Sequence, residues 1–131
     1  LKYCFLMHLA ALGISLVILL GGAFLGCPVL SIVFGVNLNS YSAVLDVLLI
    51  GGGFFALAVI DQVILTIMRH QYAMLWGFGL ASLFATVLSP VLVKSMGLMG
   101  AALAYTYSDA ILFLIFLLFI VFYYRKERCP R

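Results

Sequence analysis

The chain has 131 residues, of which 67% are hydrophobic and 8% are charged, whereas soluble domains average about 45–50% and about 25%. Seven Lys and Arg and four Asp and Glu make eleven charged side chains, too few to cover the surface of a water-soluble fold. This composition excludes a water-soluble globular enzyme, a nucleic-acid-binding protein and a disordered segment. It indicates an integral membrane protein or a piece of one.

Long uncharged segments predict four membrane-spanning helices, because a helix needs about 20 apolar residues to cross about 30 Å of hydrocarbon. The apolar residues run continuously instead of alternating, which argues against an outer-membrane barrel. The expected fold class is therefore all-α, an integral membrane four-helix bundle. The four spans are expected at about residues 4–34, 41–68, 72–93 and 98–124.

Glycine and proline positions predict where these helices bend. The first span is long for one crossing, and Gly21, Gly22, Gly26 and Pro28 predict a kink near its outer end. A run of three glycines at 51–53 in the second span would allow close approach of a neighbouring helix or a bend.

The basic residues predict the orientation in the membrane. With four spans, the N-terminus, the tight turn expected at 69–71 and the C-terminus lie on one side, and the turn expected at 94–97 lies on the other. The first side carries Lys2, Arg69, Arg125, Lys126, Arg128 and Arg131, and the opposite side carries Lys94. This bias predicts a plasma-membrane protein with both termini in the cytoplasm and with 125–131 as a basic cytoplasmic tail.

Recognisable patterns for catalysis and metal binding are missing from the sequence. The chain has three cysteines, Cys4, Cys27 and Cys129, and their spacing is not that of metal ligands. His8 and His70 fall near cytoplasmic helix ends outside any zinc-protease pattern, and we interpret both as interfacial polar residues. We therefore expect no enzymatic activity, no cofactor and no metal.

Two carboxyl groups are predicted to lie near mid-membrane. Asp61 precedes the turn at 69–71 by about 12 Å of helix, and Asp109 follows the turn at 94–97 by about 18 Å. A charged Asp at the centre of a spanning helix costs about 2.5–3.5 kcal/mol. One hypothesis places both on a pathway for protons, cations or a polar substrate. The alternative is a protonated carboxyl bonded to a neighbouring helix. Tyr105, one turn before Asp109, is positioned to hydrogen-bond with it.

A stripe of small residues lies on the fourth span. Gly100, Ala104 and Ser108 recur every four residues, a spacing typical of close helix packing. At about 100° per residue, Asp109 lies about 100–180° away from these three positions. We therefore expect Asp109 to face a polar cavity instead of lipid, with Asp61 a candidate for the same space.

Three stretches resemble a known family: residues 28–35 (PVLSIVFG) with 37–41 (NLNSY), 64–71 (ILTIMRHQ) and 97–105 (GLMGAALAY). Together they look like the polysaccharide and oligosaccharide (Wzx-like) flippases of the multidrug/oligosaccharidyl-lipid/polysaccharide exporter superfamily. The resemblance covers roughly residues 26–125. It implies the last four helices of a six-helix lobe of a larger transporter, in the second lobe or equivalently in the first.

The resemblance also implies a function. Such flippases move undecaprenyl-pyrophosphate-linked oligosaccharide repeat units across the membrane for surface polysaccharide biosynthesis. The implied partners are the lipid bilayer, a lipid-linked glycan, the remaining helices of the transporter and a coupling cation. Two alternatives stay open: a small four-helix multidrug exporter, whose first-span glutamate this chain lacks, and a membrane scaffold or interaction subunit that does not transport.

Overall fold

The computed structural model describes residues 2–35 and 41–128, with the side chains of 6–33, 35, 41–123 and 125. Its elements are α1 (Lys2–Gly21), a π-helical turn η1 (Gly22–Gly26), α2 (Cys27–Phe34), α3 (Ser42–Ile67), α4 (Gln71–Met96) and α5 (Leu98–Arg128). Four segments are long and apolar enough to cross a membrane: Leu6–Val33, Ser42–Ile67, Gln71–Met96 and Leu98–Tyr123. This confirms the all-α class and a multi-pass membrane protein.

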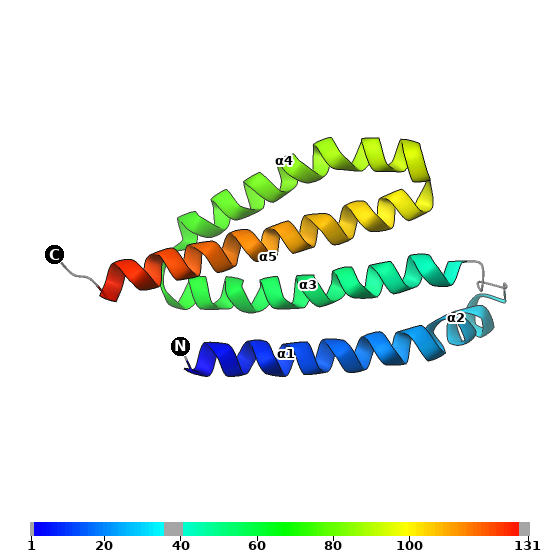
Figure 1. Ribbon diagram of the computed structural model, residues 1–131, viewed down its shortest axis with the longest axis horizontal. Coiled ribbons are helices and arrows are strands. Elements are labelled where there is room, and N and C mark those ends of the chain that lie inside the picture. The colour runs from blue at the N-terminus through cyan, green and yellow to red at the C-terminus, as the bar shows by residue number, and fades with distance from the viewer. Residues whose placement is uncertain (1, 36–40, 129–131) are drawn as a thin grey trace.

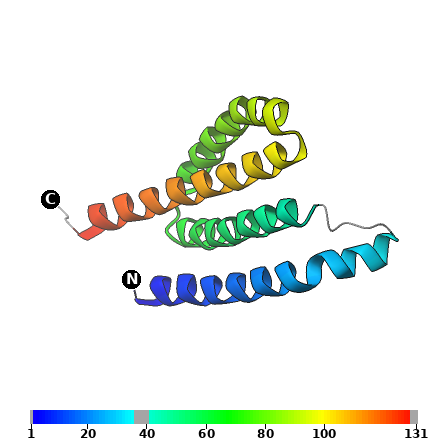
Figure 2. The same cartoon turned by 45° about the vertical axis from the view of Figure 1, so that its right-hand side comes forward.

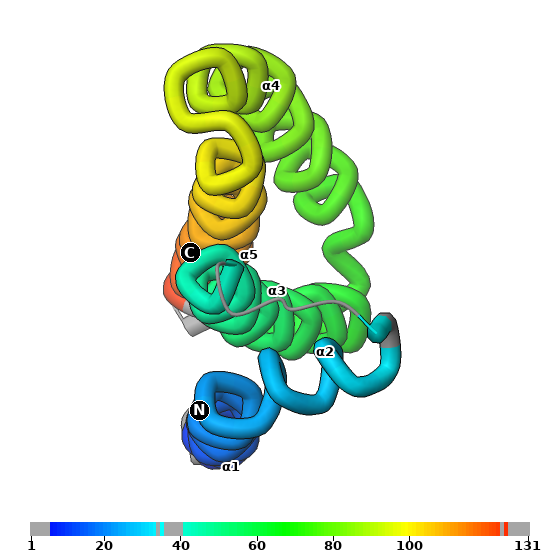
Figure 3. The backbone as a smooth tube through the Cα atoms, turned by 90° about the vertical axis from the view of Figure 1, so that its right-hand side faces the viewer, coloured from blue at the N-terminus to red at the C-terminus, as the bar shows by residue number. Residues whose placement is uncertain are grey.

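The first span is interrupted at the expected place. The π-helical turn η1 separates α1 from α2, and Pro28 occupies the first turn of α2. Proline lacks a backbone N–H, so it cannot close the regular helical bond, and a wider turn accommodates this loss. Viewed end-on, α2 leaves the axis of α1 sideways (Figure 3). Gly35 then ends α2 in the left-handed conformation, with a φ of 65°. The rest of the expected loop, 36–40, lies outside the described residues.

The helices form an open bundle. In Figures 1 and 2, α5 lies between α3 and α4, and α1 lies on the outer side of α3. α3 and α5 run in the same direction, whereas α1 and α4 run in the opposite one (Figure 1). The core lies among α3, α4 and α5, where Leu65 and Phe116 are fully buried. By contrast, the first span has the smallest buried share of the four, so α1 is the peripheral helix.

The turn between α3 and α4 is tight, as predicted. The N–H of Arg69 donates to the carbonyl of Thr66 at 3.0 Å, and the N–H of His70 donates to the carbonyl of Leu65 at 3.1 Å. This Schellman pattern requires a left-handed residue, and Arg69 fills it with a φ of 59°. The His70 ring stacks on Tyr123 of α5 with a centroid distance of 3.8 Å.

The turn between α4 and α5 is shorter than the predicted 94–97. α4 continues through Pro90 to Met96, and Gly97 alone reverses the chain with φ 58° and ψ −129°. At the other end, α5 extends to Arg128, so the first four residues of the predicted basic tail continue the helix.

Candidate functional site

A histidine and an aspartate form a polar pair between α1 and α3. The Nε2 atom of His8 lies 2.8 Å from Oδ1 of Asp61. Asp61 is fully buried, and the His8 side chain is 17% exposed. Phe113 of α5 approaches the His8 ring with a centroid distance of 6.3 Å. The pair therefore lies between α1 and α3, with a ring of α5 beside it.

Helix lengths explain how these two side chains meet. His8 lies six residues after the start of α1 and Asp61 six residues before the end of α3, so both are about 9 Å inside the same end of an antiparallel helix pair. The sequence interpretation of His8 as an interfacial polar residue did not include this contact with Asp61. Its depth in the helix, equal to that of Asp61, was the sequence signal that could have found the pair.

The pair leaves one carboxylate atom unused. Oδ2 of Asp61 is buried and has no hydrogen-bond partner among the described residues. A buried polar atom without a partner is costly, and in native proteins such atoms gather at functional positions. Oδ2 is thus a free acceptor when the carboxyl is ionised and a proton-binding position when it is neutral.

Asp109 lies in a second polar cluster, between α5 and α3. The residue is 8% exposed, its Oδ2 has no hydrogen-bond partner among the described residues, and the Tyr105 hydroxyl lies beside its carboxyl. Gly51 of α3 makes room here, because a Cβ on it would come within 2.9 Å of both Tyr105 and Thr106. The hydroxyl of Thr106 donates to the carbonyl of Val47 at 2.9 Å. One of the three glycines at 51–53 therefore provides the close approach expected from the sequence.

The two carboxyl groups lie at different depths in the bundle. The contacts Val47–Thr106 and Phe54–Phe113 both join residues 59 positions apart, and this register puts Asp109 level with position 50 of α3. Asp61 lies eleven residues further along α3, about 16 Å along the axis. The structure thus separates an α1–α3 pair from an α3–α5 cluster.

The small-residue stripe faces α4. A Cβ on Gly100 would collide with the carbonyl of Leu92, and Ala104 is buried with 4% exposure. Ser108 turns its hydroxyl back to the carbonyl of Ala104 at 2.8 Å. Asp109 lies on the other packed side of α5, which faces α3. The stripe and the carboxyl are therefore on different faces, as their angular spacing indicates, but both faces are packed against helices.

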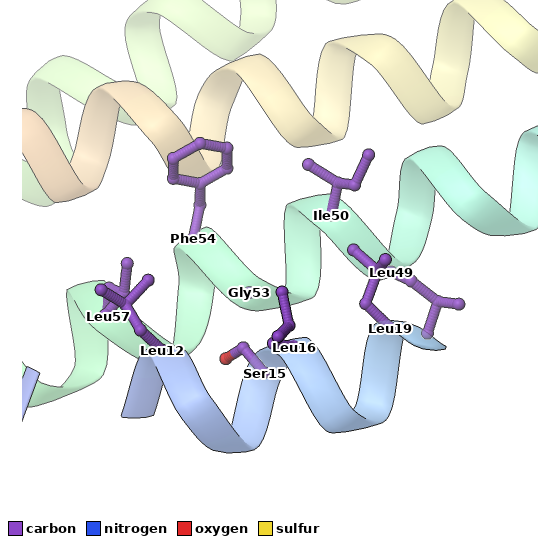
Figure 4. A pocket seen from close by; sticks show the side chains of 9 residues that line it. All are labelled: Leu12, Ser15, Leu16, Leu19, Leu49, Ile50, Gly53, Phe54 and Leu57. Atoms are coloured by element: carbon purple, nitrogen blue, oxygen red, sulfur yellow. The ribbon is translucent and has the colours of Figure 1, made fainter. Parts of the chain in front are cut away.

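Two apolar grooves flank the contact between α1 and α3. Figure 4 shows the first, of about 190 Å³, with Leu12, Ser15, Leu16 and Leu19 of α1 opposite Leu49, Ile50, Gly53, Phe54 and Leu57 of α3. The second groove measures about 370 Å³ and shares Ser15, Leu49 and Gly53 with the first. Asp109 lines neither of these two grooves, and the polar cavity expected at this residue stays a prediction.

Within the described residues, no three His, Cys, Asp or Glu side chains come together as a metal site. No protein-family model, curated protein or solved structure matches the chain. The roles of Asp61, Asp109 and Tyr105 therefore rest on their burial and contacts.

Proposed function

We propose that this chain is part of a membrane transporter, and that Asp61, Asp109 and Tyr105 belong to its substrate or ion pathway. The supporting observation is that each of two carboxyl groups is buried inside a spanning bundle with one oxygen unpartnered. Burying such groups in hydrocarbon opposes folding. A purely structural helix seam would be more stable with apolar side chains of similar volume, so transport chemistry accounts for them better than packing does.

The substrate class we propose is an undecaprenyl-pyrophosphate-linked oligosaccharide, carried to the outer leaflet by alternating access between two lobes. This part of the proposal is supported by the resemblance of residues 28–41, 64–71 and 97–105 to the flippases. A six-helix lobe would also explain why one face of α1 is exposed. In that arrangement, further helices of the transporter cover the side of α1 that α3 leaves open.

Substitution of Asp109 tests the pathway. In cells whose own copy of the gene is deleted, Asp109→Asn should lower export of the lipid-linked glycan per molecule of protein by about tenfold. That factor corresponds to the loss of one interaction with a charged group. Surface polysaccharide, lipid-linked intermediate on the cytoplasmic leaflet and protein abundance are measured together. Asp46→Asn, the same change near the beginning of α3, is the matched control and should export normally.

The outcomes separate transport from packing. Normal export at normal abundance by Asp109→Asn would remove this carboxyl from the pathway. Lower abundance with normal export per molecule would assign it to helix packing. If glycan export is normal in cells that lack the gene, the proposed substrate is wrong.

We also propose that both termini lie in the cytoplasm, because the basic residues gather at one end of the bundle. Single cysteines at 39, 95 and 129 in an otherwise cysteine-free chain test this with a membrane-impermeant thiol reagent on intact cells. Labelling should occur at 39 and 95. Labelling at 129 alone would reverse the orientation.

A further inference from the structure

The helix that carries His8 is the least embedded of the four spans. α1 packs chiefly on α3, and apolar grooves of about 190 and 370 Å³ separate the two helices on either side of their contact. Gly53 and Ser15 mark the middle of this contact, with a distance of 3.7 Å between the Ser15 Cβ and a Cβ built on Gly53. Such a loosely filled seam gives little dispersion attraction, and the His8–Asp61 bond adds a polar contact between α1 and α3.

The charge of the pair depends on how many protons it holds. With one proton between Nε2 of His8 and Oδ1 of Asp61, the pair is neutral overall and keeps a short, charge-assisted bond. A second proton, taken from water, has the unpartnered Oδ2 as its binding position. The carboxyl is then neutral while the imidazole stays charged, and the buried pair acquires a net charge of +1.

Among the described residues, His8 of α1 is the charged partner of Asp61. α5 contributes the apolar ring of Phe113. Toward the turn between α3 and α4, His70 and Tyr123 stack on each other. The adjacent core of α3, α4 and α5 is built from apolar side chains.

We propose that the His8–Asp61 pair is a proton-operated clasp, in which a second proton bound at Oδ2 of Asp61 weakens the bond and releases α1 from α3. A neutral carboxyl no longer attracts the imidazolium, and a net charge in this setting is stabilised by exposure to water. The release of α1 would join the two grooves and open the α3 surface between them. This inference is independent of which substrate the protein carries.

A disulfide between α1 and α3 measures whether the clasp is closed. Ser15→Cys with Gly53→Cys places the two Cβ atoms 3.7 Å apart, within the range that a disulfide requires. The three native cysteines are replaced by alanine, and the purified chain is placed in lipid nanodiscs, so that both faces experience the same pH. The initial rate of oxidative crosslinking is then followed from about pH 8 to about pH 5.

Variants that lack one member of the pair correct for the pH dependence of thiol chemistry. Relative to Asp61→Asn in the same cysteine background, the crosslinking rate of the parent protein should fall about tenfold between the two ends of the range. That change matches the loss of one charge-assisted hydrogen bond. His8→Gln should behave like Asp61→Asn, because glutamine hydrogen-bonds with the carboxyl in either protonation state. Asp46→Asn should follow the parent profile.

One result overturns the clasp: a single pH profile shared by the parent, Asp61→Asn and His8→Gln. If Asp61→Asn does not accumulate as folded protein, His8→Gln supplies the same reference. A parent profile that falls more steeply than that of His8→Gln as the pH is lowered, and that Asp46→Asn follows, supports the clasp even when glycan export proves unrelated to this chain.

Discussion

Gly100 holds α5 against α4 through a backbone contact that leaves no room for a methyl group. A Cβ at this position would collide with the carbonyl of Leu92 and lie 3.0 Å from the backbone nitrogen of Val93. A neighbouring side chain could rotate away from a new methyl group, but the atoms of Leu92 and Val93 at this contact belong to the backbone of α4. The end of α4 is held in place by the N–H of Gly97, which donates to the carbonyl of Val93 at 2.9 Å. Gly100→Ala therefore requires the two helices to move apart.

The expected loss of stability is about 2 kcal/mol. Overpacking of a filled site costs about 1–3 kcal/mol of stability, and we expect a collision with backbone atoms to cost the upper value of this range. The higher helix propensity of alanine offsets about 1 kcal/mol of that cost. Gly79→Ala in α4 is the matched control, since no heavy atom lies within 4 Å of its Cβ, and it should be neutral or slightly stabilising. Equilibrium unfolding in mixed detergent micelles, followed by circular dichroism, measures both. Equal stability of the two variants would refute the close contact.

Three other substitutions probe separate features by the same unfolding assay. Phe116→Ala removes a fully buried ring and should lower the free energy of unfolding by about 3–5 kcal/mol. Leu118→Ala changes a side chain that is 65% exposed and should lower it much less. Similar losses in the two variants would contradict the described core. Arg69→Gly should gain about 1 kcal/mol, because glycine adopts the left-handed conformation of this turn without strain, and a loss would show another role for the side chain. Thr106→Val should cost about 1 kcal/mol through the lost bond to Val47, and an unchanged stability would mean that the bond contributes nothing.

The sequence was most informative where the cause is local. The four spans follow from the lack of charged residues over helix-length segments. The break in the first span follows from Gly22, Gly26 and Pro28, because each changes the backbone of its own turn. The depth of Asp61 and Asp109 also follows from counting residues along a helix of known rise. The turn at Arg69 was visible as polar residues between two apolar segments, although its left-handed conformation was not.

Which helices become neighbours was decided only by the tertiary structure. These helices are apolar on nearly all sides, so no polar face indicates which side meets a partner. Packing of shapes settles it instead: Gly51 accepts Tyr105 and Thr106, and Gly100 accepts the backbone of α4. This packing places α5 between α3 and α4, separates Asp109 from Asp61 and brings His8 to Asp61. The sequence by itself therefore determined the environment, the spans and the breaks, because these depend on transfer to hydrocarbon and on local backbone bonds. The pairing of buried polar groups depends on contacts between distant segments, which only the folded chain brings together.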